Sequence, residues 1–205
     1  MALYLTLPPK VTFGPFWLFP LLVLGLLVPL SVLAPMRGKE TRHQRFASIA
    51  LIAIINLFNL YSVLMLIAHL VHPGHHVART GSELLLGGIE IWITNILVFS
   101  LWFWELDAGG PSVRAKGDSA VEFANPDFQF PQMVGGGQGP AMCVETGWKP
   151  LFVDYLFLAF NTSTALSPAD TFPLSRLAKM LMMTQSVISF ATIAMIVSRA
   201  VNILG

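Results

Sequence analysis

Long apolar runs separated by short polar connections dominate the pattern along the chain. A helix needs about 20 mostly apolar residues to cross the hydrocarbon core of a membrane. Five apolar segments approach or exceed that length, at residues 16–34, 46–71, 84–104, 151–166 and 174–204. The pattern therefore predicts an all-α, polytopic transmembrane helix bundle with four to five hydrophobic segments, forming a single transmembrane domain over the whole chain.

The fourth segment, residues 151–166, is shorter and more polar than the others. A helix of this length measures about 24 Å, which is less than the thickness of the hydrocarbon core. The segment is therefore expected to be either a short span or a re-entrant helix that turns back.

Residues 107–149, which precede the short segment, are rich in Gly and Pro. Such a composition predicts a long loop without a core of its own. Two aromatic stretches, Trp102-Phe-Trp104 before the loop and Phe128-Gln-Phe130 within it, are typical of side chains that lie at a membrane interface.

Composition supports a membrane protein and excludes several other classes. Hydrophobic residues make up 55% of the chain and charged residues only 11%, against about 25% charged in soluble domains. The net charge of +1 gives no attraction for nucleic acid. Cys143 is the only cysteine, so no internal disulfide or cysteine-based metal cluster forms. No nucleophile and base are arranged for catalysis, so neither an enzyme nor a cofactor is expected.

Basic residues predict the orientation of the chain, because Lys and Arg concentrate on the cytoplasmic side of membrane proteins. Five spans with the N-terminus outside place the first connection, the long loop and the C-terminus inside. The cytoplasmic side then holds eight of the twelve basic residues: Arg37, Lys39, Arg42, Arg45, Arg114, Lys116, Lys149 and Arg199.

Each of four predicted helices carries one face of polar residues. These faces comprise Asn56, Asn59, Ser62 and His69; Glu90 and Thr94; Asp154, Asn161 and Thr164; and Gln185, Ser189, Thr192 and Arg199. Polar groups in hydrocarbon are costly, so the faces are expected to turn inward. They either hold the bundle together by hydrogen bonds or line a pathway for an ion, a proton or a small solute. Glu90, a carboxyl group within a span, is the strongest single candidate for such a pathway.

Histidines cluster where the second segment ends. His69 and His72 are one helical turn apart, and His75 and His76 follow the helix-breaking Pro73-Gly74. Paired imidazoles can bind a metal or a haem, but no nearby cysteine or carboxylate completes a known ligand spacing. The sequence therefore predicts a histidine cluster at the membrane interface.

The motif Thr162-Ser-Thr164-Ala-Leu-Ser167-Pro-Ala-Asp170 is followed by Pro173 and Arg176. It resembles the pore-loop and inner-helix region of the potassium-channel superfamily, where a pore helix leads into Thr-x-Thr-Thr-Val-Gly-Tyr-Gly-Asp. Ser167 and Ala169 replace the two filter glycines, and Pro168 replaces the tyrosine. The resemblance implies a degenerate filter without potassium selectivity, because Ala and Pro do not readily adopt the backbone conformations of that filter.

Three further motifs resemble those of an uncharacterised family of bacterial polytopic integral membrane proteins. They are Trp104-Glu-Leu-Asp107 with Gly109-Gly110-Pro111, Phe128-Gln-Phe130-Pro131, and Asp154-Tyr-Leu-Phe157. This resemblance implies a multi-pass protein of the bacterial inner membrane and assigns no activity.

Two functions follow as expectations. The first is a channel-like protein that passes ions or protons without potassium selectivity, along a path lined by Glu90, Asp154, Asn161, Thr162, Thr164, Ser167 and Asp170. The second is a non-conducting structural or accessory subunit of a membrane complex. The expected partners are the lipid bilayer and either further copies of the chain or a membrane partner protein.

Overall fold

A computed structural model describes residues 42–71, 81–116, 126–133, 148–164 and 170–204. Helices account for 86% of them, which confirms the all-α class. Three helices are long and apolar enough to cross a membrane: α4 (Arg42–Val71), α5 (Gly81–Leu106) and α8 (Arg176–Leu204). The predicted segment 16–34, Ser167 and the histidines at 72, 75 and 76 lie outside the described residues, as does the side chain of His69.

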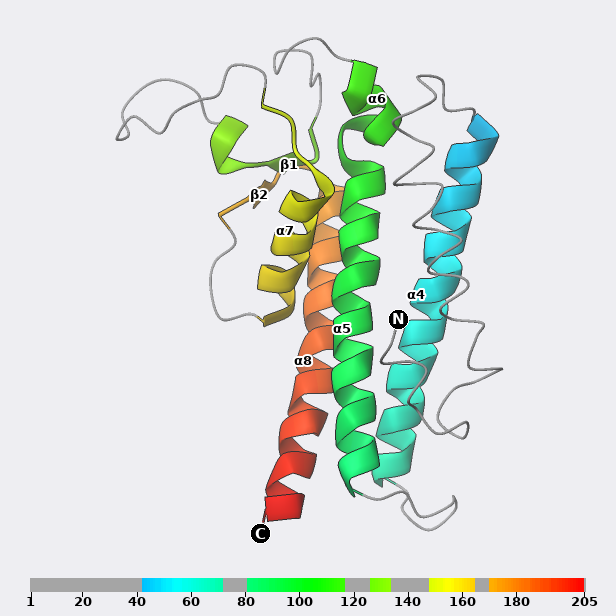
Figure 1. The fold of residues 1–205 in the computed structure, drawn as a ribbon, viewed down its shortest axis with the longest axis vertical. Helices are drawn as coiled ribbons and strands as arrows, with labels where there is room; N and C mark the ends of the chain where they lie inside the picture. Colours follow the sequence, from blue (N-terminus) through cyan, green and yellow to red (C-terminus); the bar gives the residue numbers. More distant parts are fainter. Residues whose placement is uncertain (1–41, 72–80, 117–125, 134–147, 165–169, 205) are drawn as a thin grey trace.

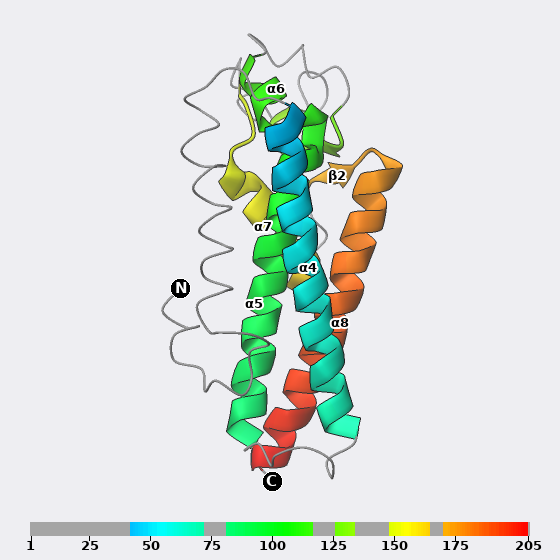
Figure 2. The ribbon, with the colours of Figure 1, turned by 90° about the vertical axis from the view of Figure 1, so that its right-hand side faces the viewer.

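The central helix is α5, which contacts both α4 and α8 and runs antiparallel to each (Figures 1 and 2). Gly88 marks a close approach between these helices. A Cβ atom at this position would lie 2.7 Å from Cγ1 of Ile196 on α8 and 3.8 Å from Cδ2 of Leu66 on α4. A small residue here allows the backbones to pack closely, as is usual between helices in membranes.

The short helix α7 (Phe152–Thr164) has 13 residues, or about 20 Å, and follows the bundle for only part of its length (Figure 1). The chain then returns to the end at which α7 began. Strand β2 (Phe172–Pro173) pairs antiparallel with β1 (Phe128–Gln129), and the Phe128 ring also contacts Tyr155 near the start of α7. The starts of α7 and α8 therefore lie at the same end of the bundle.

This return changes the topology predicted from charge. The C-terminal end of α8 lies at the opposite end of the bundle from the described residues 107–116 and 126–133 (Figure 1). The prediction that the long loop and the C-terminus share one side is therefore wrong, because α7 does not run the length of the long helices.

The end of the bundle at which α7 starts is covered by short elements, and we call it the capped end. These elements are η2 (Asp107–Gly109), α6 (Pro111–Lys116), β1, η4 (Pro131–Met133) and β2 (Figure 2). Helix α5 stops there because Ala108, Gly109 and Gly110 have φ angles of 49°, 82° and 102°. These left-handed conformations break the helix and turn the chain back over its end.

Aromatic side chains form the core beneath the capped end. Phe99, Phe103, Phe128 and Tyr155 are almost fully buried and contact one another edge to face or at a tilt. Phe130 also packs against Tyr155, with a ring-centroid distance of 5.3 Å. The predicted interfacial position of Phe103, Phe128 and Phe130 is therefore wrong, because α7 and the capping elements enclose them.

Candidate functional site

An inner polar cluster joins the three long helices. The amide of Asn59 on α4 donates to the side-chain oxygen of Asn95 on α5, at 3.4 Å. Asn95 in turn donates to Oγ of Ser189 on α8, at 2.8 Å. All three side chains are buried. Asn95 therefore connects α4 and α8 through direct hydrogen bonds between side chains.

A second part of the inner polar cluster fastens α7 to α8. Nε2 of Gln185 donates to the Ala159 carbonyl oxygen at 2.7 Å and to Ser163 Oγ at 2.8 Å. Ser186 donates to the Thr162 carbonyl oxygen at 3.3 Å. Gln185 is fully buried, so these bonds fix the inner half of α7 against α8.

Glu90 lies apart from the inner polar cluster. It is half-buried on α5 and shares a face with Leu86, Ile93 and Leu97, which are exposed. Within the described part of the chain, its buried Oε1 atom accepts no hydrogen bond. The structure therefore places Glu90 on the outer face of α5 and not beside the polar residues of α7.

The predicted polar residues of α7 make mostly local contacts. Asp154 Oδ2 accepts a hydrogen bond from the Leu151 amide at 2.7 Å and so caps the start of the helix. Thr162 donates to the Leu158 carbonyl oxygen, and Thr164 donates to that of Asn161. Asn161 and Thr164 are half-buried, so they remain accessible from outside one copy of the chain. Asp170 is exposed beyond α7, before β2.

Asp107 holds the capped end together. One carboxylate oxygen accepts hydrogen bonds from the backbone amides of Asp127 and Phe128, at 2.7 and 3.3 Å. The other accepts a hydrogen bond from the Tyr155 hydroxyl on α7. A single buried side chain therefore joins the end of α5, the segment carrying β1, and α7.

Arg114 closes the same cluster from α6. Its guanidinium donates to the carbonyl oxygens of Trp104 and Asp107, at 2.7 and 2.6 Å, and so caps the end of α5. It also lies over the Trp104 ring at 4.5 Å and the Tyr155 ring at 5.1 Å. Burial lowers the pKa of Arg114, while Asp107 and other nearby groups raise it. The group stays cationic, because arginine does not deprotonate in proteins.

A buried carboxylate links α4 to the same end. Glu105 is fully buried, and its Oε1 lies 4.0 Å from Nε of Arg45 on α4. Arg45 also lies over Gly110, where a Cβ atom would be 3.5 Å from the guanidinium carbon. The two buried acidic residues Glu105 and Asp107 therefore lie close to two basic residues, Arg45 and Arg114.

Sequence reasoning singled out the motifs of the capped end but not their contacts. Trp104, Asp107, Phe128 and Tyr155 were grouped only by family resemblance, although they are far apart along the chain. One feature of the sequence could have indicated the role of Asp107, namely that Gly109 and Gly110 follow it closely. A carboxylate beside a tight turn often accepts hydrogen bonds from backbone amides.

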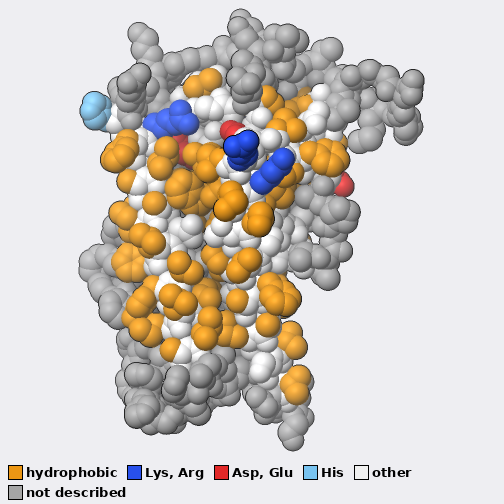
Figure 3. All heavy atoms as spheres, turned by 180° about the vertical axis from the view of Figure 1, so that it is seen from behind, with side chains coloured by type: hydrophobic (Ala, Val, Ile, Leu, Met, Phe, Trp, Pro, Cys, Tyr) orange, Lys and Arg blue, Asp and Glu red, His pale blue; other side chains and the backbone are white. Residues whose placement is uncertain are grey.

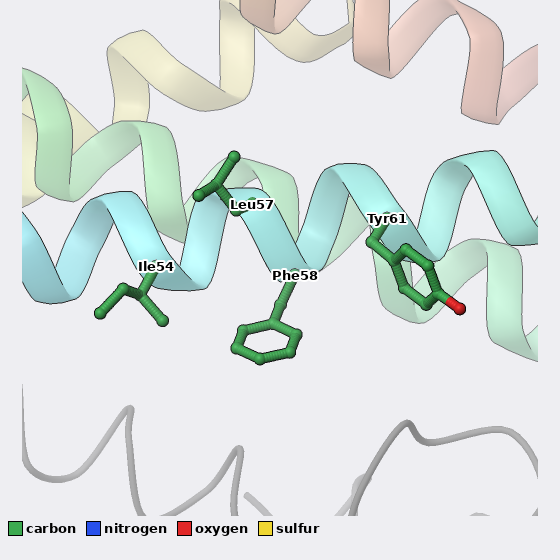
Figure 4. Close-up of a pocket in the computed structure, with 4 residues that line it drawn as sticks. All are labelled: Ile54, Leu57, Phe58 and Tyr61. Atoms are coloured by element: carbon green, nitrogen blue, oxygen red, sulfur yellow. The ribbon is translucent and has the colours of Figure 1, made fainter.

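The described residues offer few other places for chemistry. In these ranges no three His, Cys, Asp or Glu residues are placed to hold a metal ion. An open hollow of about 320 Å³ is lined by Ile54, Leu57, Phe58 and Tyr61 on α4 (Figure 4). These side chains share the outer face of one helix and are mostly apolar, so the hollow carries no catalytic group.

Comparison with known proteins finds no match: no family model, no curated protein and no solved structure is similar to this chain. The resemblances in the sequence therefore rest on their motifs alone.

Gly110 provides a direct test of the turn that forms the capped end. Its φ of 102° disfavours side chains, and a Cβ atom would lie 3.1 Å from the Glu105 carbonyl oxygen. We expect Gly110→Ala to lower the free energy of unfolding by about 2 to 3 kcal/mol, measured by denaturation in detergent.

Gly109→Ala is the matched control for Gly110→Ala. Gly109 also has a positive φ, but a Cβ atom there would meet only Val113, at 3.5 Å. The expected loss is about 1 to 2 kcal/mol, from conformational strain alone. Equal losses in the two variants would show that crowding by Glu105 and Arg45 contributes nothing.

Proposed function

We propose that this protein is a channel-like membrane protein in which α7 is a re-entrant helix. The observation that carries the proposal is the return of the chain, after a 13-residue helix, to the end where that helix began. Non-helical backbone at membrane depth is tolerated only where it is buried in protein or lines a water-filled cavity. The order of a long helix, a half-length helix and a second long helix also agrees with the pore-loop resemblance of the sequence.

The path is proposed to lie between copies of the chain. Within one copy, the side chains of Asn59, Asn95 and Ser189 are occupied by hydrogen bonds to one another across the helices. The half-buried Asn161 and Thr164, near the inner end of α7, are the described polar groups best placed to line a path between copies.

Glu90 supports an assembly of several copies. Ionisable groups at membrane depth nearly always face protein or water rather than lipid. The Oε1 atom of Glu90 is buried without a described partner, on a face that is otherwise apolar. We propose that, in the bacterial inner membrane, a neighbouring copy covers the apolar side chains of Leu86, Ile93 and Leu97 beside Glu90, which are exposed in one copy.

A flux assay tests the proposed function. Purified protein is reconstituted in liposomes, and potassium, sodium and proton fluxes are measured under opposing gradients. We expect flux without potassium selectivity, since Ser167-Pro168-Ala169 replaces the filter sequence. A reversal potential at the potassium equilibrium value would contradict the proposed selectivity.

Variants locate the path in the same assay. Asn161→Leu and Thr164→Val are expected to reduce flux at least fivefold, and Glu90→Gln is expected to alter proton flux. Ser62→Ala on α4 is the control, because the Ser62 hydroxyl bonds to the Phe58 carbonyl oxygen of its own helix and, in the part of the chain that the structure describes, to no other group.

One observation favours the alternative of a non-conducting structural or accessory subunit. The polar side chains inside the bundle, including Gln185 and Asn95, are used to fasten helices together. A monomeric state in detergent, together with no flux in liposomes, would support that function and refute the channel-like one.

A further inference from the structure

The described Lys and Arg residues are distributed unevenly between the two ends of the bundle. Seven of the eight belong to the capped end, and only Arg199 lies near the other end; the seven are Arg42, Arg45, Arg114, Lys116, Lys149, Arg176 and Lys179. Figure 3 shows the same asymmetry on one face, where Lys and Arg side chains lie toward the capped end of a largely apolar surface. Such an asymmetry marks the cytoplasmic end of a membrane protein.

Two of these residues stand where helix electrostatics disfavours them. Arg176 and Lys179 occupy the first turn of α8, and positive charge near a helix N-terminus opposes the helix dipole. Both are exposed, and neither forms a salt bridge within the described ranges. They also stand at the start of the apolar span Arg176–Ser198. An anionic group outside the protein, at the level of the lipid headgroups, would compensate their charge.

Two of the other basic residues at the capped end already have partners within the protein. Arg45 lies beside the buried Glu105, and Arg114 is held by carbonyl oxygens and close to the carboxylate of Asp107. Arg176 and Lys179 differ from them in exposure and in lacking a carboxylate partner. Of these four residues, Arg176 and Lys179 are therefore the better placed to bind lipid.

We infer that the capped end is cytoplasmic and that Arg176 and Lys179 bind the phosphates of anionic lipids in the cytoplasmic leaflet. Since α7 starts and returns at the capped end, it enters the membrane from the cytoplasm. The C-terminal end of α8 then lies on the other side of the membrane. Pore loops of the potassium-channel superfamily enter from outside, so this orientation is the reverse. The inference holds whether or not the protein conducts.

Cysteine labelling tests the orientation. In a Cys143→Ser background, Gln132→Cys places a thiol in the exposed part of η4, and Gly205→Cys places one just after α8. Bacterial spheroplasts expressing each variant are treated with a membrane-impermeant maleimide. We expect labelling at position 205 in intact spheroplasts, and labelling at position 132 only after lysis. The opposite result would overturn the orientation, and equal accessibility of both positions would overturn the return of α7.

Thermal unfolding tests the lipid contact. Wild-type protein in neutral detergent is mixed with phosphatidylglycerol or with phosphatidylcholine. We expect phosphatidylglycerol to raise the Tm by several degrees more than phosphatidylcholine does. The Arg176→Gln/Lys179→Gln double variant should retain less than half of that difference, while Arg199→Gln at the other end of α8 should retain most of it.

Two results would refute the lipid contact. The first is an equal effect of both lipids on the wild-type protein. The second is an equal loss in the Arg199→Gln variant, which would show that the effect of charge is not specific to the capped end.

Discussion

Asp107→Ala is expected to lower the free energy of unfolding by about 4 kcal/mol, the largest effect of any single substitution proposed. Removing the carboxylate leaves the amides of Asp127 and Phe128 and the Tyr155 hydroxyl without their acceptor. It also removes one of the two carboxylates whose charge acts on the buried Arg114 guanidinium. Each buried donor left without an acceptor costs about 1 to 3 kcal/mol, so the loss of the acceptor for the Phe128 amide and the Tyr155 hydroxyl accounts for most of this effect.

Denaturation in detergent micelles measures this loss, and fluorescence of Trp104 and Trp148 reports on the capped end. Tyr155→Phe removes a single hydrogen bond to Asp107 and should cost about 1 to 2 kcal/mol. Asp170→Ala removes an exposed carboxylate and should change the unfolding free energy by less than about 0.5 kcal/mol. If Asp107→Ala is as stable as Asp170→Ala, Asp107 does not hold the capped end together.

The sequence predicted the long helices well because their signal is local. Each span is a continuous apolar run, and such a run is readable without any knowledge of its neighbours. The predicted segments 46–71, 84–104 and 174–204 lie within or overlap the three long helices. The inward position of Asn59 and Ser189 also agrees with the structure, because helical spacing places residues three or four apart on one face.

The capped end could not be predicted in the same way, since its contacts join residues far apart in the sequence. Asp107 meets Tyr155 across 48 positions, and Phe128 pairs with Pro173 across a comparable gap. The Gly- and Pro-rich composition correctly indicated turns. It did not indicate that Phe128 and Phe130 would fill the space between α5 and α7, because burial there depends on the return of the chain.

The polar residues of the candidate path were predicted only in part, because their positions also depend on how distant parts of the chain pack. The helical spacing predicted that Glu90 and Thr94 share a polar face of α5. In the structure, Glu90 lies instead on a face with the exposed apolar side chains of Leu86, Ile93 and Leu97. Asn95, adjacent to Thr94 in sequence, is instead the residue that forms hydrogen bonds to α4 and α8. Periodicity identifies a face of a helix, whereas the direction of that face depends on where α4, α7 and α8 pack.

Asn95→Leu is expected to lower the free energy of unfolding by about 2 to 3 kcal/mol. The substitution nearly preserves volume but removes the hydrogen bonds to Asn59 and Ser189. Interhelical hydrogen bonds in membranes contribute about 0.6 kcal/mol each on average. The larger part of the loss comes from the buried Asn59 amide, because a polar group left without a partner costs about 1 to 3 kcal/mol.

Two comparisons isolate this effect. Ser100→Ala on the same helix removes a buried hydroxyl that bonds, among the described residues, to the Leu97 carbonyl oxygen alone, so its effect should be below about 0.5 kcal/mol. The double variant Asn59→Leu/Asn95→Leu should recover part of the loss, because two apolar side chains then face each other. If the loss of unfolding free energy in the double variant equals the sum of the losses in the two single variants, Asn59 and Asn95 act separately.

The same variant separates a path between copies from a path through one copy. If ions or protons move between copies, along Asn161 and Thr164, the assembled Asn95→Leu protein should retain its flux in liposomes. If the path instead ran through the centre of one copy, the apolar side chain of Leu at position 95 would block the flux. Loss of flux in an Asn95→Leu protein that still assembles would therefore move the path into the inner polar cluster and overturn its proposed position at α7.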